Sequence, residues 1–253
     1  MASPAADPSA AEEREYLFRL KGVFKDRAEH ERYMADSWNR MRVVLELLEG
    51  LRPFGVKKVL ELGANPYLLT LLLRKRFDFD LELANYFGEA MGPGTYTHVG
   101  ELDGRRLEFP FTVFNVEADP FPYPDARFDC VLFCEILEHL LLGPDKAVAE
   151  MARVVKPGGF LIVTTPNITR LTNLYFLALG RNILDWYSPY GPYGRHNREY
   201  TLPEVQDLLA RHGFEPFRHT VRNIQPLARR FTWTMKLRPD VWQEHLFVVG
   251  RKR

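Results

Sequence analysis

The segment VLELGANP at residues 59–66 joins an apolar run to a turn and gives the first indication of the fold. Residues 56–62 (VKKVLEL) have the composition of a buried strand, and residues 67–77 (YLLTLLLRKRF) that of a helix. The same pattern predicts strands at 80–85, 111–116, 128–134, 160–165 and 244–250, with helices at 145–155 and 202–212. Alternating strands and helices are typical of a mainly parallel sheet with helices on both faces. We therefore expect a doubly wound α/β fold.

The regions that flank this alternation divide the chain further. Residues 1–14 are rich in small and acidic side chains, which predicts a disordered tail. Residues 15–53 follow as an N-terminal helical extension or lid, with helices expected at 15–27 and 31–51. The main domain then covers residues 54–253, with insertions near 88–110 and 181–200.

Composition limits the class of protein. The 253 residues include 34 Lys+Arg and 33 Asp+Glu, a net charge of +1 that argues against a broadly basic nucleic-acid surface. No apolar run approaches the ~20 residues that a membrane span needs. The N-terminal residues lack the basic and apolar stretches of a secretory signal, and Cys130 and Cys134 lie too far apart on one predicted strand to form a disulfide. We expect a reduced, cytoplasmic protein.

The two insertions carry different signals. In the first, GELDGRRLEF at 100–109 predicts a hairpin that turns near Asp103 and Gly104. The second gathers aromatic residues among glycine and proline, namely Trp186, Tyr187, Tyr190, Tyr193 and Tyr200. These rings could stack on a sugar or an aromatic acceptor, or pack against one another as a surface loop. The sequence leaves both interpretations open.

Polar residues follow several predicted strands at the points where the strands end. In an open parallel sheet, ligands bind beyond these carboxyl ends. VLELGANP at 59–66, VEADPFPYPDARFD at 116–129, CEILEHL at 134–140 and RVVKPGGFLIVTTPN at 153–167 stand there in order. In these motifs the chain resembles the class I S-adenosylmethionine (SAM)-dependent methyltransferases, from Val56 to Phe214 and again in the final strand. The resemblance implies a Rossmann-like, mostly parallel sheet of seven strands, and SAM as the cofactor.

The resemblance also implies roles for individual residues. Gly63 lets the backbone approach the methionine part of SAM, because no Cβ is in the way. Glu61 orients that loop, Asn85 stands where the family places a ribose-binding acid, and Glu117 matches the carboxylate that accepts from the adenine amino group. The full expected cofactor-binding set is Glu61, Gly63, Ala64, Asn65, Asn85, Glu117, Ala118 and Cys134.

The first motif departs from the glycine-rich pattern of the family. Asn65 and Tyr67 occupy its second and third glycine positions. Asn tolerates a left-handed backbone, so the turn can form, while Tyr67 would narrow the loop or stack on the ligand. The motif also lacks the G-x-G-x-x-G of nicotinamide-binding enzymes. It leaves room for a non-catalytic binding or scaffold protein with a methyltransferase fold.

A second group of residues points to catalysis. If CEILEHL at 134–140 is helical, Glu135, Glu138 and His139 share one face. With His196 from HNREYT at 196–201, they resemble the ligands that hold Mg²⁺ in small-RNA 3′-terminal 2′-O-methyltransferases, and the resemblance implies Mg²⁺ or Mn²⁺ here. The alternative needs no metal: His139 or His196 acts as a base, because neutral imidazole suits the removal of a hydroxyl proton.

The sequence therefore predicts a SAM-dependent methyltransferase. The expected reaction is O-methylation of a small polar acceptor, such as a saccharide or a natural-product intermediate, with His139 and His196 as catalytic residues. The first alternative is a metal-dependent methyltransferase of RNA 3′ ends, which the near-neutral charge and the lack of an appended RNA-binding domain disfavour. The second is the non-catalytic scaffold.

Overall fold

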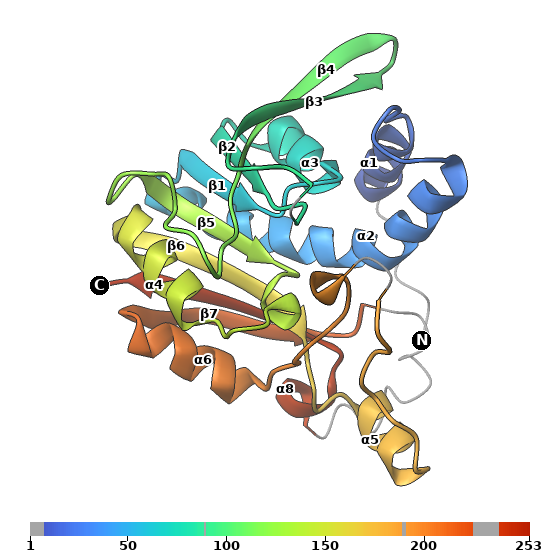
Figure 1. Ribbon diagram of the computed structural model, residues 1–253, viewed down its shortest axis with the longest axis vertical. Helices are drawn as coiled ribbons and strands as arrows, with labels where there is room; N and C mark the ends of the chain where they lie inside the picture. Colours follow the sequence, from blue (N-terminus) through green and yellow to red (C-terminus); the bar gives the residue numbers. More distant parts are fainter. Residues whose placement is uncertain (1–7, 89, 189–190, 225–237) are drawn as a thin grey trace.

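One eight-stranded sheet forms the centre of the computed structural model, which describes residues 8–88, 90–188, 191–224 and 238–253 (Figure 1). The strands are β1 (Lys58–Leu62), β2 (Asp80–Asn85), β3 (Gly94–Leu102), β4 (Arg105–Val113), β5 (Phe128–Cys134), β6 (Val155–Pro166), β7 (Phe214–Arg222) and β8 (His245–Lys252). The longer helices are α1 (Pro8–Phe18), α2 (Arg27–Glu49), α3 (Leu68–Arg76), α4 (Asp145–Val154), α5 (Leu171–Ala178) and α6 (Leu202–Arg211). Shorter helical turns are η1 (Arg52–Phe54), η2 (Leu137–His139), η3 (Pro192–Gly194) and α8 (Pro239–Trp242).

The strand order places a ligand-binding crevice between β1 and β5. The order is β3-β4-β2-β1-β5-β6-β8-β7, and the five strands from β4 to β6 are parallel to one another. The chain moves outward from β1 to β2 and then returns to add β5 on the other side of β1. Leu62 at the end of β1 is level with Ala84 in β2 and Phe133 in β5. This is the doubly wound fold that the sequence predicts, with its reversal point at β1.

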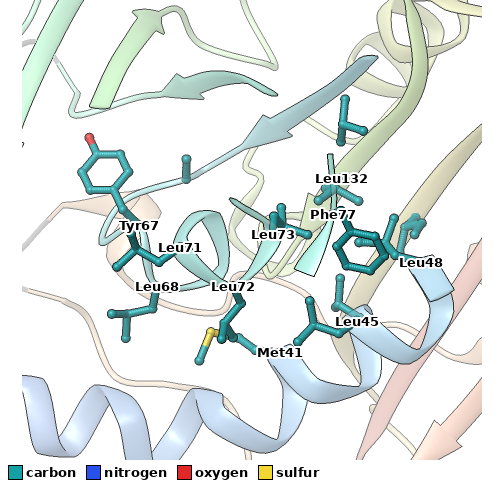
Figure 2. Close-up of a cluster of buried hydrophobic side chains, with 14 of the residues drawn as sticks. Met41, Leu45, Leu48, Tyr67, Leu68, Leu71, Leu72, Leu73, Phe77 and Leu132 are labelled. Carbon is teal, nitrogen blue, oxygen red and sulfur yellow. The ribbon is translucent and has the colours of Figure 1, made fainter. Parts of the chain in front are cut away.

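Side chains of the central strands alternate between two cores, one on each face of the sheet. In β5, Cys130 and Leu132 pack on the side of α2 and α3, while Val131 and Phe133 pack on the side of α4 and α6. Figure 2 shows the first core, in which Leu132 lies near apolar residues of α2 and α3. The labelled members are Met41, Leu45, Leu48, Tyr67, Leu68, Leu71, Leu72, Leu73, Phe77 and Leu132.

The sheet has eight strands, where the family resemblance implied seven and the apolar pattern located six. The additional edge strand is β3, which pairs with β4 as a hairpin and turns at Asp103 and Gly104, both with positive φ (53° and 75°). The predicted hairpin is therefore confirmed, and β4 begins at Arg105 rather than at Phe111. Strand β7 has no clear apolar alternation, because five consecutive side chains from Glu215 to His219 are exposed.

The N-terminal helices differ from the prediction in their bounds. Helix α1 begins at Pro8, so the expectation of disorder up to residue 14 is wrong for residues 8–14, and residues 1–7 lie outside the described residues. Tertiary contacts explain the difference: Leu17 is fully buried, and Glu13 forms a two-pronged ion pair with Arg76 of α3 at 2.5 and 2.6 Å. Helix α2 begins at Arg27, where the Asp26 side chain accepts from the Glu29 N–H at 2.8 Å.

Candidate cofactor and acceptor site

Two adjoining cavities lie at the carboxyl ends of β1, β2 and β5. The β2-side cavity is lined by Leu62, Gly63, Ala84, Asn85, Tyr86, Phe114, Asn115, Val116, Glu135, Ile136, His139, Leu140 and Tyr193. The α2-side cavity is lined by Tyr33, Ser37, Arg40, Met41, Val44, Glu61, Leu62, Gly63, Ala64, Asn65, Pro66, Leu68, Leu69, Cys134, Glu135, Ile136 and Thr164. Leu62, Gly63, Glu135 and Ile136 line both cavities, so the turn after β1 and the end of β5 form their shared wall.

The turn after β1 presents bare backbone to the two cavities at Gly63. Gly63 has a φ of 66° and is exposed to the cavities, and a Cβ built on it would lie 3.0 Å from Cδ1 of Ile136. The Asn85 side chain supports the same turn, because its Oδ1 accepts from the Asn65 N–H at 2.8 Å. Behind the turn, Glu61 is buried and accepts from the Thr70 hydroxyl at 2.7 Å, and burial raises the pKa of Glu61 to about 7. The predicted residues of this motif thus meet at one place.

Tyr67 does not reach the ligand site. Its ring is fully buried and stacks on Phe109 of β4 with 4.3 Å between the ring centroids. Its hydroxyl lies 2.7 Å from Nδ1 of His98 and accepts from the Asn85 side-chain amide at 3.2 Å. The expectation that Tyr67 narrows the loop or stacks on the ligand is wrong, because its left-handed backbone (φ 66°) turns the ring into the core.

The Glu117 carboxylate holds a neighbouring loop. Its Oε1 accepts from the backbone N–H groups of Leu141, Leu142 and Gly143 at 2.7, 2.7 and 3.2 Å. Its Oε2 is buried and has no hydrogen-bond partner among the described residues. The Ala118 N–H donates to the Asn115 carbonyl at 3.2 Å, so it is not directed into the cavity. In this segment, Phe114, Asn115 and Val116 line the β2-side cavity.

Replacing Glu117 by Ala is expected to destabilise the protein. The change leaves three backbone N–H groups without their acceptor, and we expect the free energy of unfolding to fall by about 1–3 kcal/mol. Chemical denaturation would measure this. Glu117→Gln, which keeps one side-chain oxygen, should lose less free energy of unfolding than Glu117→Ala. Equal stability of the wild type and both variants would contradict the observed hydrogen bonds.

Glu135 belongs to a network under the α2-side cavity. Its carboxylate lies 2.5 Å from Arg40 Nη1 and 2.6 Å from His245 Nε2, and it accepts from the Thr164 hydroxyl at 2.6 Å. Burial opposes ionisation, but the charges of His245 and Arg40 outweigh it and hold the pKa of Glu135 well below its usual range. Arg40 comes from α2, so the N-terminal extension completes this wall.

Glu138, His139 and His196 come together in a second group beside the β2-side cavity. One ligand atom from each lies within 4.8 Å of the others. Glu138 is fully buried; its Oε2 accepts from the Thr165 hydroxyl at 3.0 Å, and its Oε1 has no partner among the described residues. Burial and the nearby charge of Glu135 raise the pKa of Glu138 to about 8. Three of the four residues predicted to bind a metal therefore meet, while Glu135 is engaged by Arg40 and His245.

The pKa values of the two histidines of this group are shifted in opposite directions. The Nδ1 of His139 lies 2.8 Å from the Arg195 carbonyl oxygen, which can only accept, so Nδ1 carries the proton and Nε2 is the free acceptor of the neutral ring. Burial lowers the pKa of His139. Burial disfavours the charged form of His196 as well, but a 3.2 Å hydrogen bond to Glu199 outweighs it, and the pKa of His196 is raised. His139 is thus the ring held neutral.

The buried Glu138 should make stability depend on pH. Its pKa is about 8 in the folded state and near 4.5 when unfolded, so the folded protein holds this proton more tightly. The free energy of unfolding should therefore decrease as the pH rises from about 4.5 to 8. We expect Glu138→Gln, which resembles the protonated acid, to raise the melting temperature by about 2–4 °C at pH 8 relative to wild type. This difference in melting temperature should shrink at pH 5. A difference that does not change with pH would contradict the raised pKa of Glu138.

Several residues of the site are not evident from the sequence. Arg40 belongs to an amphipathic helix whose pattern indicates only packing, and His245 begins a strand predicted for its apolar residues. Asn115 and Tyr193 are joined by a 3.1 Å hydrogen bond across 78 positions of the chain. Of the aromatic insertion, Tyr193 lines the β2-side cavity, whereas Trp186 and Tyr187 are exposed and Tyr190 lies outside the described residues.

Together, the reversal of strand order at β1, the open turn at Gly63 and the polar residues at the ends of β2 and β5 define a class I SAM-dependent methyltransferase fold. The comparison with protein families agrees. Residues 27–219 match a family model described as a methyltransferase domain, and the chain belongs to this family.

Curated relatives match over part of their length. A probable S-adenosylmethionine-dependent methyltransferase of Mycolicibacterium smegmatis is 38% identical over 96 residues, which cover 37% of this chain and 31% of the relative. A fatty-acid O-methyltransferase of the same organism is 33% identical over 89 residues, 32% of each chain. A ubiquinone biosynthesis O-methyltransferase of Rhizobium johnstonii is 28% identical over 128 residues, 50% of this chain and 49% of the relative. The chain thus spans about a third to a half of these relatives.

Solved structures support the fold. A SAM-dependent methyltransferase from Archaeoglobus fulgidus superposes with a TM-score of 0.54 at 14% identity, covering 87% of this chain and 99% of that one. A Burkholderia thailandensis 1,6-didemethyltoxoflavin-N1-methyltransferase, solved with 1,6-didemethyltoxoflavin and S-adenosylhomocysteine, gives a TM-score of 0.52 at 16% identity, covering 100% and 93%. At this identity the likeness concerns the fold alone.

Proposed function

We propose that this protein transfers a methyl group from SAM to a hydroxyl oxygen of a small acceptor. The observation that carries the proposal is the His139 ring, which lines the β2-side cavity and keeps Nε2 unprotonated through its Nδ1 contact with the Arg195 carbonyl. A hydroxyl is a weak nucleophile until its proton is removed, and a neutral imidazole suits that task. The names of two relatives, both O-methyltransferases, support oxygen as the acceptor atom.

The residues around the turn after β1 fit SAM. At Gly63 the wall shared by the two cavities is bare backbone, and a side chain there would press against Ile136. When bound, SAM supplies an electrophilic methyl group on a sulfonium ion. We assign its methionine part to the α2-side cavity, lined by Glu61, Gly63, Ala64, Asn65 and Cys134. We assign its adenosine part to the end of the β2-side cavity where Asn85 and Asn115 offer polar groups, and the acceptor to the end that His139 lines.

Glu117 would act at the edge of the adenosine site. Its Oε1 is occupied by the 141–143 backbone, so Oε2 is the oxygen left to accept from the adenine amino group. On this assignment Glu117 both holds the loop and contacts the cofactor. Ala118 has no comparable role, since its N–H already donates to Asn115.

His139 would act as the general base. The acceptor's hydroxyl proton passes to Nε2 of His139 as the oxygen takes the methyl group. The lowered pKa of His139 keeps the ring able to accept this proton at neutral pH. His196, held by Glu199 at 3.2 Å and with a raised pKa, would orient the acceptor by donating a hydrogen bond. The small polar acceptor predicted from the sequence is part of this proposal.

A divalent cation is the second candidate for the same group, because Glu138, His139 and His196 offer donor atoms within 4.8 Å of one another. These three would hold Mg²⁺ or Mn²⁺, which would polarise the acceptor hydroxyl. Glu135 would not take part in the arrangement described, since Arg40 and His245 engage its carboxylate. The predicted alternative acceptor for such a site is the 3′ end of an RNA.

Calorimetric titration with SAM, once in EDTA and once in Mg²⁺, is the first test. We expect micromolar binding in both buffers, followed by label transfer from methyl-labelled SAM to hydroxyl acceptors in EDTA. Transfer that EDTA abolishes and Mn²⁺ restores would favour the metal-dependent alternative. A folded protein that binds no SAM in either buffer would refute the proposal and favour the scaffold.

A further inference from the structure

An exposed apolar surface lies on α5 and the segment that follows it. Four consecutive α5 residues contribute, and four more come from residues 179–187. This α5 surface consists of Leu174, Tyr175, Phe176, Leu177, Leu179, Leu184, Trp186 and Tyr187. Their exposed fractions range from 39% for Phe176 to 86% for Trp186. Figure 1 shows α5 projecting from the body of the protein, near α8 and away from the β3–β4 hairpin. Apolar patches of this kind mark sites of interaction.

The apolar residues surround α5 rather than forming one face. Residues 174–177 are consecutive, so at about 100° per residue they point in all directions around the helix axis. The buried residue of α5 is a polar one, Asn173. A rigid protein surface would cover one side of such a helix, whereas lipid molecules can rearrange around a helix that projects from the protein, as α5 does (Figure 1). The arrangement therefore favours lipid over protein.

The charges near the α5 surface suit anionic headgroups. Between residues 171 and 188, the charged residues are Arg181 and Asp185. Arg181 and Asp185 are both exposed, and the Asp185 carboxylate also accepts from the backbone N–H of His196 at 3.1 Å. Arg195 lies over the Tyr187 ring at 4.5 Å. Two positive side chains, Arg181 and Arg195, thus stand against one negative side chain, Asp185. They lie beside Trp and Tyr rings, which concentrate at the interface between lipid and water.

We propose that the α5 surface docks on the surface of an anionic phospholipid bilayer. In the described residues, no helix is long and apolar enough to cross a bilayer, and α5 itself has eight residues. The contact is therefore interfacial: α5, Leu184 and Trp186 enter the headgroup boundary, and Arg181 lies among the lipid phosphates. This docking does not depend on the proposed methyl transfer.

Hydrogen bonds join the α5 surface to the candidate acceptor site. Asn173 donates to Glu199 at 3.2 Å, and Arg170, just before α5, pairs with the same carboxylate. Glu199 in turn contacts Nδ1 of His196 at 3.2 Å. The docked helix would thus hold the histidine side of the β2-side cavity close to the membrane surface.

Vesicle flotation with the full chain tests the docking. The vesicles contain phosphatidylcholine with about a quarter phosphatidylglycerol. We expect the wild type to float with them, and the double variant Leu177→Ser/Trp186→Ser to bind about tenfold more weakly. The matched control is Val99→Ser/Leu142→Ser, which removes two exposed apolar side chains elsewhere and should bind like the wild type. Arg181→Glu should also weaken binding, and high salt should reduce that of the wild type.

Three results would overturn the docking. The first is a wild type that does not float with the vesicles, and the second is a Leu177→Ser/Trp186→Ser variant that floats as well as the wild type. The third is a control variant whose vesicle binding is weakened as much as that of the Leu177→Ser/Trp186→Ser variant. Sedimentation velocity tests the alternative that the α5 surface binds a second copy of the chain. In that case the wild type would be a dimer that does not bind vesicles, and the Leu177→Ser/Trp186→Ser variant would be a monomer. Titration of every variant with SAM separates a failure of the docking from a failure of the proposed function, since docking can fail while cofactor binding is retained.

Discussion

His139→Ala is expected to reduce turnover by about 10²–10⁴-fold while leaving SAM affinity close to that of the wild type. The variant removes Nε2, the acceptor for the hydroxyl proton in the proposed reaction. The rest of the cavity should persist, because the His139 side chain is only partly buried and the variant keeps the backbone hydrogen bond from the His139 N–H to the Ile136 carbonyl at 2.9 Å. Single-turnover rates with labelled SAM, measured beside calorimetric affinity, separate the two effects.

The pH profile distinguishes a base from a merely structural histidine. Because burial lowers the pKa of His139 below its ordinary value of 6.5, wild-type turnover should hold at neutral pH and fall only in more acidic solution. The acidic limb should disappear in the residual activity of His139→Ala. His219→Ala, which alters an exposed histidine on β7, is the matched control and should keep both rate and profile. Full turnover in His139→Ala would leave His139 without the proposed role.

The ends of the parallel strands were predictable because buried strands appear in the sequence as short apolar runs with clear limits. The apolar runs at 59–62 and 128–134 contain few polar residues, and each ends where chemistry-bearing residues begin. Once these strands are placed side by side, their carboxyl ends must meet at one edge of the sheet. Gly63, Asn85 and Glu135 were therefore expected to lie together whatever the directions of their side chains, and all three line the β2-side cavity.

Side-chain directions were not predictable from spacing. The sequence suggests that Glu135, Glu138 and His139 share a helical face, yet the helical turn η2 covers only Leu137–His139. Glu135 precedes it with a φ of 56°, a left-handed conformation that no spacing rule predicts. Its carboxylate therefore meets Arg40 and His245, each about a hundred positions away in the sequence. Tyr67 was misplaced for the same reason.

Gly63→Ala is expected to weaken SAM binding by roughly 10- to 100-fold, which corresponds to about 1.4–2.8 kcal/mol. The added methyl group would lie 3.0 Å from Cδ1 of Ile136, in the wall that the two cavities share. Ile136 can rotate away, but the methyl group would still occupy the place where the backbone approaches the cofactor. The substitution also strains the backbone, since alanine at a φ of 66° costs about 1–2 kcal/mol.

Gly55 provides a matched control, because it separates backbone strain from cavity filling. It has a φ of 67°, and a Cβ there would meet nothing within 4 Å. Gly55→Ala should therefore lose about as much stability as Gly63→Ala but bind SAM like the wild type. Equal affinity in the two variants would remove Gly63 from the cofactor site. A loss confined to Gly63→Ala would show that the bare backbone after β1 receives SAM, even though Asn65 and Tyr67 replace the other two glycines of the motif.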